Sequence, residues 1–220
     1  MKYFFLLLFI QLSATLMMAQ TDTTSTMSVM VNGKEYKTVP RHIRISNYGY
    51  ITGNAINPDK SLRIWLGTYD GSAVKESGTY LIVDADYPDT QENMKTAYSS
   101  GMYKGIAAIK YVEETKSPRM EYHVGMSNNK GETIEVKFGK DGYAEFTFNS
   151  ILNGTWWKEK GTATAFGGLG RIVGKMEDKA VTGATGFDQD IDPEGNGYKK
   201  QKETDMITLT NGKVRIKMLN

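Results

Sequence analysis

Apolar and polar residues alternate along most of the chain, and this period of two is typical of half-buried β-strands. In the segment SLRIWLGT, Leu62, Ile64 and Leu66 fall on one face, and Arg63 and Trp65 fall on the other. Turn-forming pairs separate such segments about every 8–12 residues, which is the spacing of sandwiches and barrels. The pattern therefore predicts an all-β fold, either an antiparallel β-sandwich or an open barrel.

Three β-hairpins are predicted from Asn-Gly or Asp-Gly pairs, and the signal at Asn32-Gly33 is strong because a type I′ turn requires positive φ at both central residues. The pairs are Asn32-Gly33, Asp141-Gly142 and Asn211-Gly212, and alternating residues flank each of them. Further strands are predicted at 41–47, 50–56, 79–85, 105–113 and 120–126, with one or two more within 155–166.

Helix is predicted in only two short stretches. In DTQENMKTAYSS, Asp89 is a candidate N-cap and Glu92 follows three residues later, as in a capping box. The second stretch is GRIVGKMEDKAV, residues 170–181. We therefore expect one or two short helices beside the sheet.

The first nineteen residues have the pattern of a secretory signal peptide. Lys2 precedes an unbroken apolar run, Tyr3–Ile10, and the segment ends at the small residue Ala19. The run is shorter than the roughly 20 residues that span a bilayer, and no second run of that length follows. We predict a signal peptide at 1–19, a flexible hydroxyl-rich tether at 20–28 and a single all-β domain at 29–220. The protein is then exported to the periplasm, the cell surface or the medium, with no transmembrane span after cleavage.

The amino-acid composition excludes several kinds of functional site. The chain has no cysteine, which excludes disulfides, thiolate metal sites and cysteine nucleophiles. Its 27 basic and 25 acidic residues are mixed in sign along the chain, whereas a nucleic-acid binder usually shows a basic stripe. Only two histidines exist, His42 and His123, and strand alternation predicts that both point outward, away from any nucleophile. An enzyme is therefore not favoured.

One stretch, DQDIDPEGNGY, has acidic residues at every second position. They are Asp188, Asp190, Asp192 and Glu194. Calcium loops draw oxygen ligands from alternating positions, with Gly at the sixth and a bidentate Glu at the twelfth. Counted from the first acid, the sixth residue is Pro193; counted from the second, the twelfth is Gln201. The stretch is therefore either an irregular calcium site or a solvated turn, and no other cofactor is predicted.

Tryptophan supplies the candidate binding residues. Trp156 and Trp157 are adjacent, so on a strand they point to opposite faces and one of them is expected to be exposed. An exposed Trp on a sheet is a platform for a sugar ring or a partner protein. Trp65, opposite the apolar face of its strand, is a second candidate platform. The alternative for each is burial under a loop or against another sheet.

Three patches resemble a group of exported and lipid-anchored proteins of the Bacteroidota. They are MVNGKEYKT, SLRIWLGTYDG with the following SGTYLI, and DMITLTNGKVRIKML. Those proteins often open on a hairpin of the form NGK.W and end on a strand of the form ItnGkf.v. The chain departs in having Tyr36 where Trp is commoner and in lacking a lipid-bearing Cys. The resemblance implies an all-β, sandwich-like domain in the cell envelope, and it implies no catalytic residue.

Together these observations predict a binding or structural module of the cell envelope. Its ligand or partner is a glycan, a lipid or another envelope protein, contacted by Trp65 and by Trp156 or Trp157. Two alternatives stay open. One is a carboxylate-dependent hydrolase of an envelope polymer, and the other is a β-barrel that carries lipid.

The acidic stretch generates a first testable prediction. A ligand that binds only the folded state raises the melting midpoint. At one hundred times its dissociation constant it adds about 2.7 kcal/mol to the free energy of unfolding. The residues at the sixth and twelfth positions fit a calcium loop poorly, so a solvated turn is favoured. A turn predicts the same melting midpoint in millimolar calcium and in chelator. A higher midpoint in calcium would instead establish a calcium site.

Overall fold

The computed structural model describes residues 25–45, 48–53, 59–68, 76–86, 99–115, 121–160 and 198–217, with single positions 74, 92, 95, 97 and 193. Most of these residues belong to strands, which confirms the all-β prediction. No helix among them is both long and apolar enough to cross a membrane. The predicted signal peptide and the second predicted helix lie outside the described residues.

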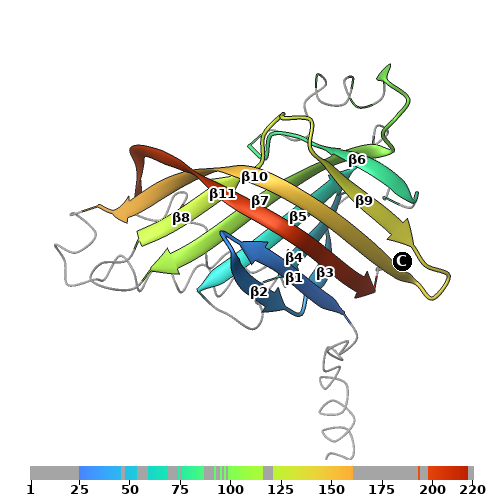
Figure 1. Ribbon diagram of the computed structural model, residues 1–220, viewed down its shortest axis with the longest axis horizontal. Coiled ribbons are helices and arrows are strands. Elements are labelled where there is room, and N and C mark those ends of the chain that lie inside the picture. The colour runs from blue at the N-terminus through green and yellow to red at the C-terminus, as the bar shows by residue number, and fades with distance from the viewer. Residues whose placement is uncertain are drawn as a thin grey trace, which may run out of the picture.

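The described strands form one sheet, shown in Figure 1. The strands are β1 (Thr26–Val31), β2 (Lys34–Thr38), β3 (Arg41–Ile45), β4 (Tyr48–Gly53), β5 (Lys60–Gly67), β6 (Gly78–Ile82), β7 (Gly105–Thr115), β8 (Glu121–Met126), β9 (Thr133–Phe138), β10 (Tyr143–Glu159) and β11 (Tyr198–Lys217). Their order is β2-β1-β11-β10-β9-β6-β7-β5-β4-β3, and β8 pairs with both β10 and β7. Every described pairing is antiparallel except that of β6 with β7, so the sheet is mixed rather than purely antiparallel.

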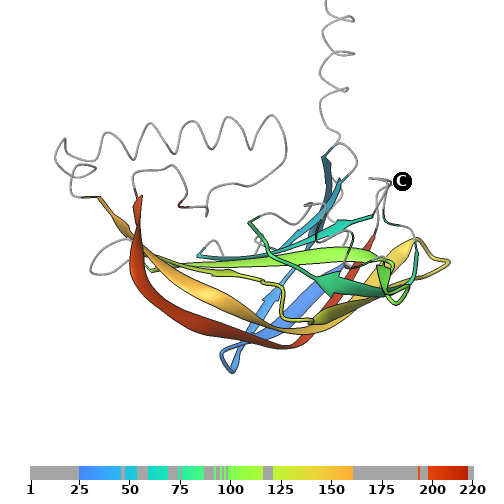
Figure 2. The ribbon, with the colours of Figure 1, turned by 90° about the horizontal axis from the view of Figure 1, so that it is seen from above.

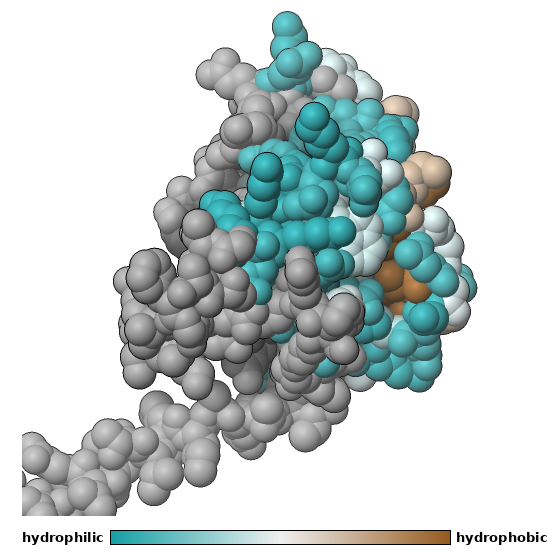
Figure 3. Space-filling model, turned by 90° about the vertical axis from the view of Figure 1, so that its left-hand side faces the viewer, coloured by the Kyte–Doolittle hydropathy of each residue, from teal (hydrophilic) through white to brown (hydrophobic). Residues whose placement is uncertain are grey.

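The sheet is strongly curved. Figure 2 shows β10 and β11 bent into an arc, with β5 and β7 on its concave side. We call the concave face, which carries the main core, the inner face, and the opposite one the outer face. At the end of the molecule where β10 finishes, the surface of the described residues is mostly hydrophilic (Figure 3).

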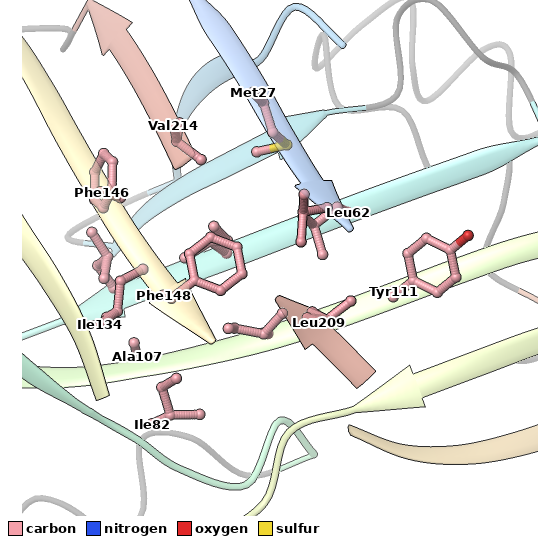
Figure 4. Close-up of a cluster of buried hydrophobic side chains, with 14 of the residues drawn as sticks. Met27, Leu62, Ile82, Ala107, Tyr111, Ile134, Phe146, Phe148, Leu209 and Val214 are labelled. Atoms are coloured by element: carbon pink, nitrogen blue, oxygen red, sulfur yellow. The ribbon is translucent and has the colours of Figure 1, made fainter. Parts of the chain in front are cut away.

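The inner face carries one continuous apolar core (Figure 4). Met27 of β1, Leu62 of β5 and Phe146 of β10 belong to it, and each is at most 1% exposed. Burying one such side chain contributes about 1.5–3 kcal/mol. Across the core, the ring of Tyr36 from β2 meets the ring of Tyr111 from β7 edge-on, with centroids 6.3 Å apart. Strands that are far apart in the strand order therefore pack against each other through their inner faces.

Two of the three predicted hairpins are confirmed. Between β1 and β2, Asn32 and Gly33 have φ of 48° and 78°, as a type I′ turn requires. The side chain of Asn32 also accepts a hydrogen bond from the backbone N–H of Thr208 in β11, at 2.8 Å. Between β9 and β10, Gly142 has a φ of 81° in the turn.

The third predicted hairpin, at Asn211-Gly212, is wrong, because β11 runs straight through these residues. Asn211 has a φ of 55° and lies where the pairing of β11 with β10 shifts by one residue. A positive φ at an Asn-Gly pair serves a β-bulge as well as a turn. The extra residue has a definite effect: Leu209 and Val214, five positions apart, both reach the inner face.

Two further predictions need a correction or an addition. The predicted tether at 20–28 extends too far, since β1 begins at Thr26 and Met27 is buried in the core. The prediction failed because the segment is rich in hydroxyl residues, although Met27, Val29 and Val31 fall at every second position, as in a strand with one buried face.

The described residues Glu92, Lys95, Ala97 and Ser99 are helical, as the capping box predicts, and Ala97 packs in a smaller cluster on the outer face.

The bulge leads to a stability prediction. A Cβ added at Gly212 would lie 2.5 Å from Cζ of the buried Phe148, and overpacking of this kind costs about 1–3 kcal/mol. We therefore expect Gly212→Ala to lower the free energy of unfolding by that amount in chemical denaturation. Lys213→Ala, at the exposed neighbouring position, is the control and should have little effect.

A double mutant tests the cause of that loss. Phe148→Leu removes the atoms that the new Cβ meets, so Gly212→Ala should cost less in the Phe148→Leu background than in the wild type. Equal costs in the two backgrounds would contradict the packing explanation.

Candidate functional site

Charged and aromatic side chains cross the inner face at the end of the apolar core. The strand register places Lys60 of β5 opposite Glu113 of β7, Glu113 opposite His123 of β8, and His123 opposite Trp156 of β10. Asp205 of β11 completes this set by contact with His123. We call Lys60, Glu113, His123, Trp156 and Asp205 the inner-face row.

The row arises because the inner-face positions of each strand change from apolar to polar residues while the alternation of the two faces continues. On β5 the inner-face positions pass from Leu62 to Lys60, and on β7 they pass from Tyr111 to Glu113. Register is fixed by the buried apolar residues, so the polar residues two positions further on must share their face. The core thus aligns the row across five strands.

His123 is the centre of the row. Its Nε2 lies 2.8 Å from Oδ1 of Asp205, and a carboxylate only accepts hydrogen bonds, so Nε2–H is the donor. Its ring is parallel to the indole of Trp156, with 1° between the planes and 4.2 Å between the centroids. Only 8% of His123 is exposed. The prediction that His123 points outward is therefore wrong: alternation identifies two faces but does not say which one is buried.

Gly154 makes this arrangement possible. It lies on β10 directly opposite Asp205, and two residues before Trp156 on the same face. A Cβ at this position would collide with Oδ1 of Asp205 and would lie 2.9 Å from Nε2 of His123. The hydrogen bond between Asp205 and His123 therefore passes over a position that only glycine leaves open.

At the end of the row on β5 and β7, Lys60 and Glu113 form a polar network with Tyr111. Nζ of Lys60 lies 3.0 Å from Oε1 of Glu113, and the hydroxyl of Tyr111 donates to Oε2 of Glu113 at 3.0 Å. In Figure 4 this hydroxyl points away from the apolar cluster. Burial, and then the charge of Glu113, raise the pKa of Tyr111 well above its usual range. Tyr111 therefore stays a neutral donor that holds the Glu113 carboxylate in place.

The three predicted platform residues have different environments. Trp156 and Trp157 are both partly exposed, but Trp156 lies in the row, whereas Trp157 faces the outer side and packs against the cluster of Val112, Tyr122 and Val124. Nζ of Lys200 lies 5.9 Å from the centroid of the Trp157 ring. Trp65 is 6% exposed and belongs to the smaller outer-face cluster, so the expectation of an exposed platform there is wrong. The same cluster contains the helical residue Ala97, so Trp65 is buried together with a residue from another element.

The candidate calcium ligands Asp188, Asp190, Asp192 and Glu194 lie outside the described residues. Within the part of the chain that the structure describes, no group of three or more His, Asp or Glu side chains could hold a metal ion. The side chain of His42 also lies outside the described part, so its predicted orientation stays a prediction.

Comparison of the chain with protein-family models, with curated proteins and with solved structures finds no match. The resemblance to exported proteins of the Bacteroidota therefore stays a prediction.

The role of Gly154 is testable by substitution. Gly154→Ala should displace Asp205 from His123, lower the free energy of unfolding and change the fluorescence of Trp156, whose indole stacks on the imidazole. In an Asp205→Ala background the nearer obstacle is gone and only Nε2 of His123, 2.9 Å from the new Cβ, remains, so the same substitution should cost less, with a coupling of about 0.5–3 kcal/mol. Additive effects of the two substitutions would contradict the proposed contact.

Proposed function

We propose that the protein is an exported binding module of the cell envelope, and that it contacts its ligand through the inner-face row. The observation that carries this proposal is the partly exposed indole of Trp156, fixed by His123 and flanked by exposed charged side chains. Export follows from the N-terminal pattern of basic, apolar and small residues. The candidate ligands are a glycan, a lipid and another envelope protein.

Preorganisation supports a binding role for Trp156. An indole loses little conformational entropy on binding, and a ring already held by a parallel stack loses less. Asp205 holds His123, and His123 covers one face of the indole, so the direction of the ring is set before any ligand arrives. Trp157 has different surroundings: it packs against the outer-face cluster of Val112, Tyr122 and Val124, and Nζ of Lys200 lies 5.9 Å from its ring centroid.

The alternative of a carboxylate-dependent hydrolase draws support from one feature, which is that Glu113 and Asp205 share the row. Each carboxylate is engaged by a cationic or hydrogen-bonding partner, Glu113 by Lys60 and Tyr111, and Asp205 by His123. A glycosidase needs one acid that protonates the leaving group. Carboxylates tied as acceptors favour binding over that role.

The two adjacent tryptophans give a matched test of the binding function. We expect the protein to sediment with insoluble envelope material, and Trp156→Ala to reduce the bound fraction at least tenfold. Trp157→Ala removes the same side chain from the opposite face and should leave the bound fraction within twofold. Circular dichroism should show that both variants keep the strand spectrum.

The proposal fails if the wild-type protein does not sediment with envelope material, or if both variants bind as well as the wild type. Mass spectrometry of the protein from producing cells tests export separately, since cleavage after Ala19 would leave Gln20 as the first residue.

A further inference from the structure

We infer that the ligand of the inner-face row is an uncharged glycan whose sugar rings lie along the row, with one ring on Trp156. This inference rests on the proposed binding function and adds the chemical class of the ligand. It is argued from the charge balance of the row, from its hydrogen-bond acceptors and from its extent.

The charged side chains of the row contact partners within the protein. Lys60 faces Glu113, and His123 is bonded to Asp205. Next to Trp156 on the same face, Nζ of Lys158 lies 3.8 Å from Oε1 of Glu121, its partner on β8. With Lys199 of β11, which lies opposite Lys158, three acids meet three lysines and one histidine, so the lysines do not outnumber the carboxylates and the surface has no large excess of positive charge. A polyanion or an anionic lipid surface needs such an excess, whereas an uncharged polar ligand does not.

The paired carboxylates keep acceptor capacity for hydroxyl groups. Each carboxylate has about four lone-pair sites, and the contacts described above occupy only some of them in Glu113 and Asp205. Their side chains are 36% and 46% exposed, so solvent or a ligand reaches them. Acceptors that are held in place and set beside an aromatic ring match the two kinds of surface on a sugar, its hydroxyl edges and its C–H face.

The extent of the row favours an oligosaccharide over a single sugar. It crosses β5, β7, β8, β10 and β11, which are four inter-strand gaps. At the usual spacing of about 4.8 Å between strands, the row is roughly 19 Å long. A single sugar ring would cover only the part around Trp156.

Lipid chains fit this surface poorly. The row consists of charged groups together with one half-buried indole and one imidazole. Apolar residues of the inner face such as Leu62 and Ile109 are fully buried in the protein's own core, so they present no apolar surface to an acyl chain.

The inference can be tested by calorimetric titration with defined probes. We expect at least one of cellohexaose, xylohexaose and laminarihexaose to bind, and Trp156→Ala to weaken that binding at least tenfold, or about 1.4 kcal/mol. Trp157→Ala should bind within twofold of wild type. Hexagalacturonate, which is anionic, and vesicles of phosphatidylglycerol and phosphatidylcholine should not bind.

Nuclear magnetic resonance of the wild-type protein removes dependence on a variant that fails to fold. The three indole N–H signals, assigned by through-bond correlations in the isotope-labelled wild-type protein, should respond unequally, and the neutral hexasaccharide should shift that of Trp156 most. Largest shifts at Trp157 or Trp65 would overturn the inference.

The outcomes separate this inference from the function on which it rests. Binding of hexagalacturonate or of vesicles but of no neutral hexasaccharide overturns the inference, and so does the absence of binding to every probe. If sedimentation with envelope material still depends on Trp156 in either case, the proposed function stands. If sedimentation does not depend on Trp156, the proposed function fails as well.

Discussion

The pairing of β10 with β11 is the constraint on which the rest of the structure depends. These are the two longest described strands, and their register extends from Tyr143 opposite Lys217 to Glu159 opposite Tyr198. Along β10, buried and exposed residues alternate without interruption from Ala144 to Gly154. Because a shift of one residue would turn a whole set of side chains to the other face, β11 must stay in phase with this pattern. The bulge at Asn211 does this by restoring the phase between Leu209 and Val214.

The same phase carries the candidate site. Beyond Leu152 the inner-face positions of β10 are occupied by Gly154 and Trp156, and beyond Ile207 that of β11 is occupied by Asp205. The apolar core therefore fixes the positions of these residues through the strand register. Glycine at 154 leaves room above the strand, and the Asp205–His123 bond and the parallel stack on Trp156 fill it. A rigid scaffold that aligns polar groups at its edge is a common basis for binding sites.

Local sequence patterns predicted the individual strands well, because alternation and turn pairs are properties of a few neighbouring residues. The strand at 60–67 and its two faces are confirmed, as is the turn at Asn32-Gly33. The failures involve partners distant in the chain. The Asn211-Gly212 pair has the positive φ that the sequence indicates, but whether it makes a turn or a bulge depends on β10 and β1, which pair with β11 on both sides.

The sequence by itself determined that the chain forms strands, where most of them lie, and that Trp156 and Trp157 point to opposite faces, since a period of two fixes all three. The tertiary structure alone decided which face is the inner one, and with it the roles of the residues. It buried Trp65 in a cluster that includes the helical residue Ala97, and it brought His123 to Asp205, which is 82 positions away in the chain. The physical reason is that alternation along a strand shows which residues share a face, but not which other strands lie next to that face. Neighbours follow from the order and curvature of the strands, which only the folded sheet fixes.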